Sequence, residues 1–227
     1  MGWKQYLSIT FPDCDSSWGD LQPIRIIFPD REVCTRGVLT DSSNVYRESP
    51  KNVMYGASKV RIRVKYYVIF EAGQYGNVAI YISTWENDTR KKFNGQYELV
   101  GILHSLDSPR SYNVIEEREA VFEFEGATMR IYVDGQELAS YTIDAPLTHF
   151  SLCAATKELY GSTGRAGVAI EQVVGEYYDQ FEDMIAQFMS IFNVMIPMMF
   201  IIMMLPMVIS LFRGIFAEPG GGRRGQA

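Results

Sequence analysis

Residues 59–70 read KVRIRVKYYVIF, which is the clearest alternation of apolar and polar residues in the chain. Every second position from Val60 to Phe70 is apolar, whereas Arg61, Arg63 and Lys65 stand between them. Successive side chains of a β-strand point to opposite faces of its sheet. The spacing therefore predicts one long strand with a buried face and a solvated face.

The same alternation recurs along the chain, while helical periodicity is nearly absent before Tyr177. Two hairpins are readable directly, because Gly126-Ala127 joins residues 120–125 to 128–133 and Asp134-Gly135 joins 128–133 to 138–143. Asp-Gly supplies the positive φ values that a tight type I′ turn requires, so these three segments predict an antiparallel meander. The remaining strands that we expect are residues 6–11, 24–28, 78–84, 97–103, 150–154 and 168–177.

About ten short strands separated by turns indicate an all-β sandwich or barrel. Four stretches are less regular, at residues 13–23, 41–57, 86–94 and 157–167. Long connections of this kind either carry binding residues or simply cross from one sheet to the other.

The second half of the chain carries a family resemblance. The segment MRIYVDGQELASYTI is followed by an apolar strand (HFSLCAA), a Gly-rich loop (YGSTGRAG) and a closing strand (GVAIEQVVGEYYD). This order, over about residues 59–179, resembles the concanavalin A-like or laminin G-like jelly rolls. The resemblance implies an antiparallel jelly-roll sandwich whose last strand pairs near the N-terminal one. It transfers no function by itself.

The average composition hides a second kind of segment. The 227 residues are 47% apolar and 21% charged, as in a soluble globular protein, and 13% aromatic, which excludes a disordered chain. Yet no charged residue lies between Asp183 and Arg213. As a helix this run is about 43 Å long, against roughly 30 Å of bilayer hydrocarbon. We therefore expect one transmembrane helix; the alternative, a buried helix, needs a protein large enough to surround it.

The span should run over residues 190–212. Pro197 and Pro206 each remove a backbone hydrogen bond, which predicts kinks or widened turns. Asn193 is an amide in lipid that seeks a partner, which predicts self-association. Tyr177 and Tyr178 are expected at the membrane interface. The residues assigned to the anchor are Met184, Ser190, Asn193, Pro197, Pro206, Phe212 and Arg213.

The distribution of charge and the sequence of the N-terminus predict different membrane topologies. Residues 1–183 carry 18 basic and 26 acidic side chains, whereas residues 213–227 carry three arginines and Glu218. The positive-inside rule places such a tail in the cytoplasm and the large domain outside. However, residues 1–11 contain no apolar signal segment, so we expect the C-terminal helix to be the sole anchor. Either a tail-anchored protein keeps its domain in the cytosol, or a virion protein faces the capsid side of an internal membrane.

These observations predict three segments: a β-sandwich at residues 1–178, an amphipathic lead-in and transmembrane helix at 179–216, and a flexible basic tail at 217–227. Arg223 and Arg224 in the tail would touch nucleic acid or anionic headgroups.

Few residues are typical of catalysis or metal binding. Cys14, Cys34 and Cys153 lack C-x-x-C spacing, and the first two either pair or remain free thiols. His104 and His149 are too few for a His-based zinc site and give little basis for a triad. We therefore expect no metal centre and no catalytic set.

Carboxylates are the remaining catalytic option, because many concanavalin-like sandwiches are glycoside hydrolases with paired acids on one strand face. Glu117 and Glu119, and likewise Glu123 and Glu125, share a face. The flanking sequences do not match the acid-rich strand of that family, and alternating Glu is typical of a solvated sheet face.

Ligand binding is proposed at three aromatic residues near loops, Tyr75, Trp85 and Tyr160, which would stack on sugars as in lectins. Asp88 or Asp107 would help to hold a structural calcium ion, and no other cofactor is expected. Asn87-Asp88-Thr89 is a glycosylation sequon.

We therefore expect a non-enzymatic, membrane-anchored structural protein, in the form of a virion component that tethers a protein shell to a lipid membrane. The alternative is a membrane-anchored lectin-like adhesion protein. The third candidate, a glycoside hydrolase, needs two carboxylates about 5–10 Å apart in a cleft. The expected partners are the bilayer of a virion or cell and further copies or other shell or surface proteins.

Overall fold

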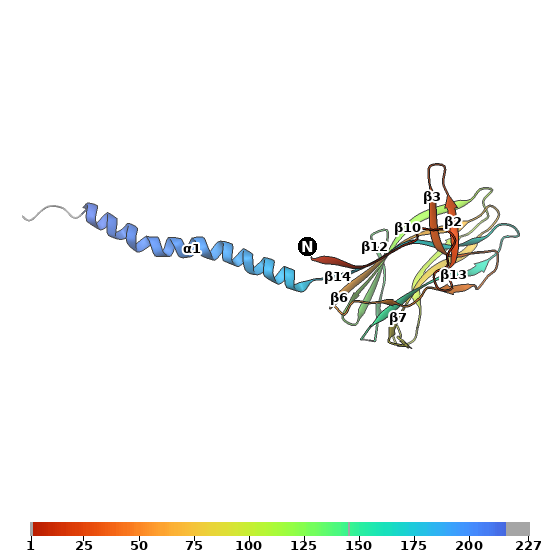
Figure 1. The fold of residues 1–227 in the computed structure, drawn as a ribbon, viewed down its shortest axis with the longest axis horizontal. Coiled ribbons are helices and arrows are strands. Elements are labelled where there is room, and N and C mark those ends of the chain that lie inside the picture. The colour runs from red at the N-terminus through yellow and green to blue at the C-terminus, as the bar shows by residue number, and fades with distance from the viewer. Residues whose placement is uncertain (1, 145, 217–227) are drawn as a thin grey trace, which may run out of the picture. The chain divides into compact units, whose positions relative to one another are not determined.

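A computed structural model describes residues 2–144 and 146–216 (Figure 1). The chain divides into two compact units: a β-sandwich at Trp3–Tyr178, and a second unit that contains Gly2 and the single helix α1 (Gln180–Phe216).

The strand at residues 59–70 forms as expected and lies in the middle of the larger sheet. This strand, β6 (Lys59–Phe70), pairs along its whole length with β10 (Val114–Glu125) on one side and with β14 (Ala166–Tyr178) on the other. Its alternate side chains from Val60 to Phe70 all enter the hydrophobic core, while Arg61, Arg63 and Lys65 lie on the opposite face.

The eight-stranded sheet has the order β12-β11-β10-β6-β14-β3-β2. The predicted meander is confirmed: β10, β11 (Thr128–Val133) and β12 (Gln136–Thr142) are antiparallel neighbours, and Asp134 and Gly135 both have positive φ. The outer edge of β14 pairs with two strands in succession, β3 (Glu32–Thr40) and β1 (Trp3–Thr10), so the last strand does return to the N-terminal one.

The smaller sheet has six strands. β13 (His149–Leu159) and β7 (Gly76–Glu86) form its centre, with β4 (Tyr46–Glu48) and β5 (Asn52–Val53) beside β13 and β8 (Thr89–Arg90) and β9 (Val100–Leu106) beside β7. The core lies between the two sheets, and every strand pairing is antiparallel. The prediction of an all-β antiparallel jelly-roll sandwich followed by one helix is therefore confirmed.

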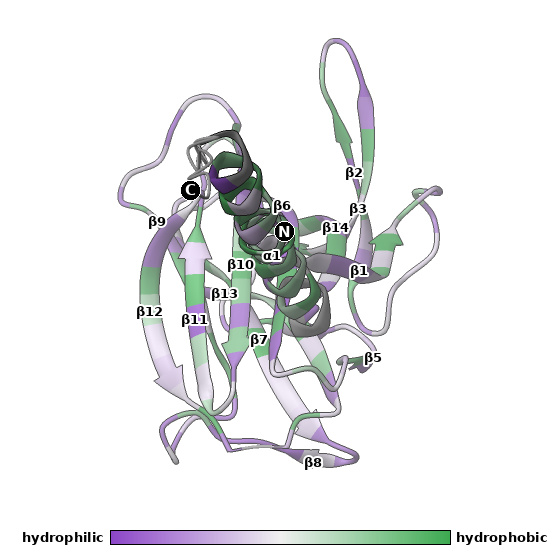
Figure 2. Ribbon diagram, turned by 90° about the vertical axis from the view of Figure 1, so that its left-hand side faces the viewer, coloured by the Kyte–Doolittle hydropathy of each residue, from purple (hydrophilic) through white to green (hydrophobic). Residues whose placement is uncertain are grey.

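One long strand was not predicted. β3 reads EVCTRGVLT and pairs with β2 (Gln22–Ile27) as a hairpin arm that projects beyond the neighbouring strands (Figures 1 and 2). It lacks alternation because several consecutive residues are buried. A second apolar cluster, which includes Ile26, Val33 and Tyr67, packs on the outer side of the eight-stranded sheet.

The two ends of the sandwich differ. At the exit end, β14 finishes at Tyr178 beside the start of β6, because Val60 pairs with Tyr177. At the far end, β13 finishes and a short loop leads into β14. Because β13 pairs antiparallel with β7, residues His149 and Trp85 lie toward the exit end, and Leu159 and Gly76 lie at the far end.

Candidate functional site

The outer face of the six-stranded sheet has a floor of small side chains. Alternation on β7 and β13 sends Ile80, Ile82 and Leu152 into the core. The intervening positions face outward and are nevertheless buried, because larger side chains surround them. These small outward residues are Ala79, Ser83, Ser151, Cys153 and Ala155.

Glu48 lies at the centre of a polar cluster on this floor. Its carboxylate accepts two hydrogen bonds from the Arg90 guanidinium, at 2.9 and 2.8 Å. It also accepts from the hydroxyls of Ser83 at 3.0 Å and Ser151 at 2.5 Å. Ser151 Oγ in turn accepts from Trp85 Nε1 at 3.0 Å. The cluster thus locks the Trp85 ring in one orientation and keeps every buried polar atom around Glu48 paired.

Trp85 and Asp88 lie together, as two of the predicted ligand residues. The Lys51 ammonium lies 4.3 Å from the Trp85 ring centroid and 2.7 Å from an Asp88 carboxylate oxygen. Arg90 also lies over this ring, at 4.5 Å. The Lys51–Asp88 pair holds the pKa of Asp88 below its usual range. A sugar that stacks on Trp85 would therefore have to displace an ammonium group.

Tyrosines gather towards the far end of the same face. Tyr46 and Tyr81 lie 6.4 Å apart, and the Lys157 ammonium lies 5.6 Å from each ring centroid. Hydrogen bonds to Tyr46 and Tyr81 raise the pKa of Lys157, so this lysine stays charged. Tyr75 and Tyr160 form a second pair, with centroids 5.5 Å apart. Tyr160 is 57% exposed and donates a hydrogen bond to Glu158.

The four predicted ligand residues therefore form two separate pairs. Trp85 with Asp88 lies towards the exit end, and Tyr75 with Tyr160 at the far end. Asp107 follows the end of β9 at the far end, so it cannot share a calcium ion with Asp88. The residues that link the two pairs, Tyr46, Glu48, Tyr81 and Lys157, were not predicted. Small residues at the outward positions of two buried strands are the signal that would have found them.

The predicted carboxylate pairs lie on the other sheet, where each acid faces a base. Glu119 pairs with Arg63 at 2.9 Å, and Glu117 with Lys65 at 3.0 Å. Glu123 and Glu125 both lie beside Lys59 and Arg130. Hydrogen bonds, first that from Lys65, lower the pKa of Glu117 and keep it ionised. This arrangement is the solvated, ion-paired sheet face that the alternating glutamates predicted.

Glu117 and Glu171, on β14, contact the same tyrosine and the same lysine. Tyr67 Oη lies 3.3 Å from Glu117 and 2.9 Å from Glu171, and Lys65 pairs with both acids. Glu171 lines a surface cavity of about 450 Å³. The juxtaposition was invisible in the sequence, because the two glutamates belong to strands that flank β6 from opposite sides.

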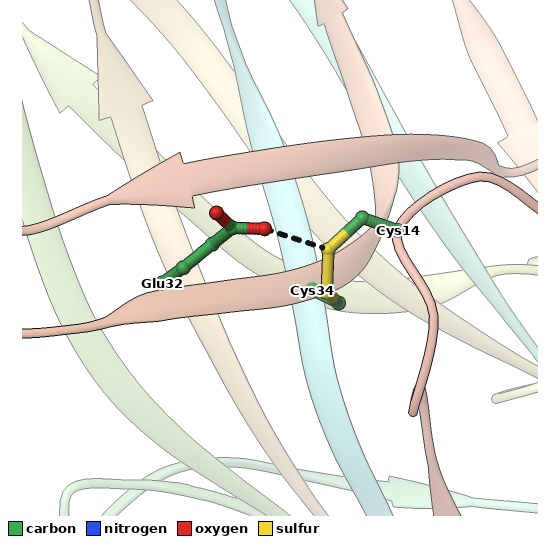
Figure 3. A group of neighbouring side chains, drawn as sticks. All are labelled: Cys14, Glu32 and Cys34. Atoms are coloured by element: carbon green, nitrogen blue, oxygen red, sulfur yellow. Dashed lines mark hydrogen bonds between the residues drawn. A yellow bond between two sulfur atoms is a disulfide. The ribbon is translucent and has the colours of Figure 1, made fainter.

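Cys14 and Cys34 form a disulfide, which decides between the two alternatives left open by the sequence (Figure 3). Glu32 lies beside it on β3, with a carboxylate oxygen 3.4 Å from Cys14 Sγ. These three residues are the one cluster of metal-binding side chains in the described part of the chain, and the disulfide occupies both sulfurs. Cys153 is a buried free thiol. The side chain of His149 forms a hydrogen bond with that of Thr148, and His104 forms one with Tyr66.

The C-terminal helix contains one segment long and apolar enough to cross a membrane, Gln187–Arg213, with a mean hydropathy of 2.5 (Figure 2). The helix runs from Gln180 to Phe216 and contains both Pro197 and Pro206. Met184, Ser190, Asn193, Phe212 and Arg213 all lie on this helix, and their surfaces are exposed. Arg223 and Arg224 lie outside the described residues.

Comparisons with known proteins identify similar folds but no family. No family model matches the chain, and no curated protein matches it. Solved structures match at the level of fold. One is an endo-β-galactosidase from Clostridium perfringens, with 11% identity over 78% of this chain and 64% of that one, and a TM-score of 0.49.

Two further matches illustrate the range of this architecture. A laminarinase catalytic domain from Thermotoga petrophila is 10% identical over 78% of this chain and 99% of that one, with a TM-score of 0.44. The exoplasmic domain of VIP36, in a form bound to Ca²⁺ and Man3GlcNAc, is 10% identical over 76% and 90%, with a TM-score of 0.41. The prediction that the chain is not an enzyme is contradicted, because glycoside hydrolases are prominent among these matches. The chain is similar in fold to concanavalin A-like glycosidases and lectins.

Proposed function

We propose that this chain is a membrane-anchored protein that binds glycans on the outer face of its six-stranded sheet. The anchor is α1, whose apolar segment Gln187–Arg213 exceeds the roughly 20 residues that a bilayer requires. The sandwich then carries the recognition surface.

The observation that carries the proposal is a contrast between the two outer faces. On the eight-stranded sheet, Lys59, Arg61, Arg63 and Lys65 are all paired with glutamates, which leaves little for a ligand to bind. On the six-stranded sheet, exposed tyrosine rings stand beside fixed polar groups. Sugar recognition needs this combination, because apolar ring faces stack on aromatics while hydroxyls need hydrogen-bond partners.

Binding to an oligosaccharide array by the full chain in nanodiscs tests the proposal. Tyr46→Ala and Tyr160→Ala should each weaken binding by roughly three- to tenfold, the usual worth of one stacked ring. Tyr97→Ala is the matched control, because Tyr97 is also about half exposed, at 54%, but lies beside Phe93 at the exit end, away from Tyr46 and Tyr160. Binding that is unchanged in both test variants would rule out this face.

Catalysis is tested in the same experiment, by measuring reducing ends released from any bound oligosaccharide. The Glu117–Glu171 pair beside the 450 Å³ cavity is the arrangement to substitute if hydrolysis is found, because both carboxylates contact Tyr67. Loss of hydrolysis in Glu171→Gln with binding retained would assign the reaction to this pair.

A second candidate function is assembly, in which the anchored sandwich tethers a protein shell, such as that of a virion, to a membrane. The observation that favours it is β12, which pairs with no strand on its outer edge among the described residues and exposes Leu138; Asn94 covers only Thr142 at its end. An open strand edge can pair with another chain. Crosslinking between copies that is lost in Leu138→Lys would support assembly, and a chain that stays monomeric in nanodiscs would count against it.

A further inference from the structure

The exit end of the sandwich carries an apolar cavity of about 280 Å³. It opens where the two sheets separate, and the loops that connect the strands there line it. Met54, Val60 and Phe124 form its buried part, and Tyr55 and Leu147 form its more exposed part. Exposed apolar surface of this kind is typical of a site that contacts another protein or a membrane.

Aromatic rings surround this opening. Tyr55 stacks on Tyr177 at 4.0 Å, and Tyr6 lies 5.7 Å from Tyr55. Trp3 and Tyr178 form an edge-to-face pair at 5.6 Å on the adjoining sheet face. Tyrosine and tryptophan are enriched at membrane–water interfaces, because their rings are apolar and their polar atoms can reach headgroups.

The chain itself brings this end close to lipid. β14 ends at Tyr178, and the membrane-length apolar segment begins at Gln187. The intervening residues are almost all helical, so they span only about 10–13 Å. A headgroup layer is itself roughly 5–8 Å thick on each side of the hydrocarbon. A sandwich connected so tightly cannot move its exit end far from the bilayer surface.

We propose that the exit end docks on the bilayer surface, with Tyr55, Leu147 and the cavity among the lipid headgroups. The proposal rests on the membrane anchoring proposed above. Charge at this end is balanced, since Lys59 pairs with Glu123 and Arg61 with Glu176. Docking therefore requires no anionic lipid, and a phosphatidylcholine bilayer is the appropriate partner. In this arrangement Tyr75 and Tyr160 lie at the end away from the membrane, within reach of a ligand in solution.

Depth-dependent fluorescence quenching tests this docking. Three single-cysteine variants of the full chain are labelled with bimane in phosphatidylcholine nanodiscs that contain a lipid with a shallow spin label. The label at Gly56→Cys reports on the opening of the cavity, and a Cβ added at this position meets no atom within 4 Å. Ser162→Cys reports the far end, and Met198→Cys reports the span. The native cysteines do not compete, because two form the disulfide and Cys153 is buried.

Quenching at Gly56→Cys should be several-fold stronger than at Ser162→Cys, and Tyr55→Ser should reduce it. Equal, weak quenching at both sites, with Met198→Cys quenched by a deep spin label, would overturn docking and leave the anchor intact. Absence of quenching at Met198→Cys would overturn the anchor and docking together. Tyr112→Ser in the Gly56→Cys background is the control, because Tyr112 is 63% exposed in the loop before β10, at the far end of the sandwich. It should leave quenching unchanged.

Discussion

At the scale of single residues, a half-buried histidine makes the sandwich sensitive to pH. His104 Nε2 lies 2.9 Å from the hydroxyl of Tyr66, whose ring is fully buried. Burial, and then the nearby Arg118, lower the pKa of His104, while Glu116 and Asp134 oppose this. The folded protein therefore holds the neutral imidazole.

The sign of the pH effect follows from this lowered pKa. The unfolded chain protonates His104 near pH 6.5, whereas the folded chain resists until a lower pH. The stability that the neutral imidazole contributes should be present above pH 6.5 and decrease as the pH falls below this value. His104→Gln should flatten this slope in urea unfolding curves. An unchanged slope in His104→Gln would contradict the assignment.

Carboxylates affect the stability of the protein in a separate, more acidic pH range. The amide and hydroxyl of Ser16 lower the pKa of Asp13 to about 2, and Arg165 lowers that of Glu71. Groups whose pKa is lowered by folding stabilise the protein above their unfolded pKa, and this stabilisation is lost as the pH falls below about 4. The range from pH 7 to 5 therefore reports mainly on histidine.

At the scale of elements, a disulfide and a buried arginine fasten the loop that follows β1. The disulfide joins Cys14 in this loop to Cys34 on β3. The guanidinium of Arg36 is 1% exposed and donates to the backbone and carboxylate of Asp13, both at 3.0 Å, and to Ser16 at 2.9 Å. A charge buried so deeply is tolerated only because these oxygens pair with it.

Removing the disulfide should therefore loosen the loop without unfolding the sandwich. The variant with both Cys14→Ser and Cys34→Ser should lose about 3 kcal/mol of unfolding free energy, as expected for a loop of this length. Urea unfolding of the wild type should shift equally on adding dithiothreitol, and the variant should not respond. Cys153→Ser is the control for the loss of a thiol. A wild type insensitive to reductant would show that the bond is absent.

At the scale of the whole molecule, the disulfide bears on topology. Disulfides persist in oxidising compartments and are rare in the cytosol. The positive-inside rule favours a cytoplasmic tail, since Arg213, Arg223 and Arg224 follow the span. From both arguments we predict that the sandwich lies on the oxidising side of the membrane that the helix is proposed to span.

An impermeant maleimide tests this placement. In intact cells or right-side-out vesicles, Ser162→Cys should be labelled without detergent, because Ser162 is exposed at the far end of the sandwich. A cysteine placed in the tail, Gln226→Cys, should react only after permeabilisation. The reverse pattern would place the sandwich in the cytosol and favour a tail-anchored protein.

Much of the fold could be predicted from the sequence, because its signals are local. The alternation of residues 59–70, the Asp134-Gly135 turn and the uncharged run after Asp183 each depend on neighbours in the chain. β3 could not be predicted in this way, since a second apolar cluster buries consecutive residues of the strand.

The sequence by itself determined the β-sandwich and the long apolar segment near the C-terminal end, and it proposed Tyr75, Trp85 and Tyr160 as separate ligand residues. Only the tertiary structure decided that Glu48 accepts a hydrogen bond from Ser151, that Glu117 and Glu171 both contact Tyr67, and that Cys14 bonds to Cys34. The physical reason is strand pairing. Backbone hydrogen bonds in an antiparallel sheet join residues far apart in the chain, and the resulting register, which no local pattern encodes, sets which side chains share a face.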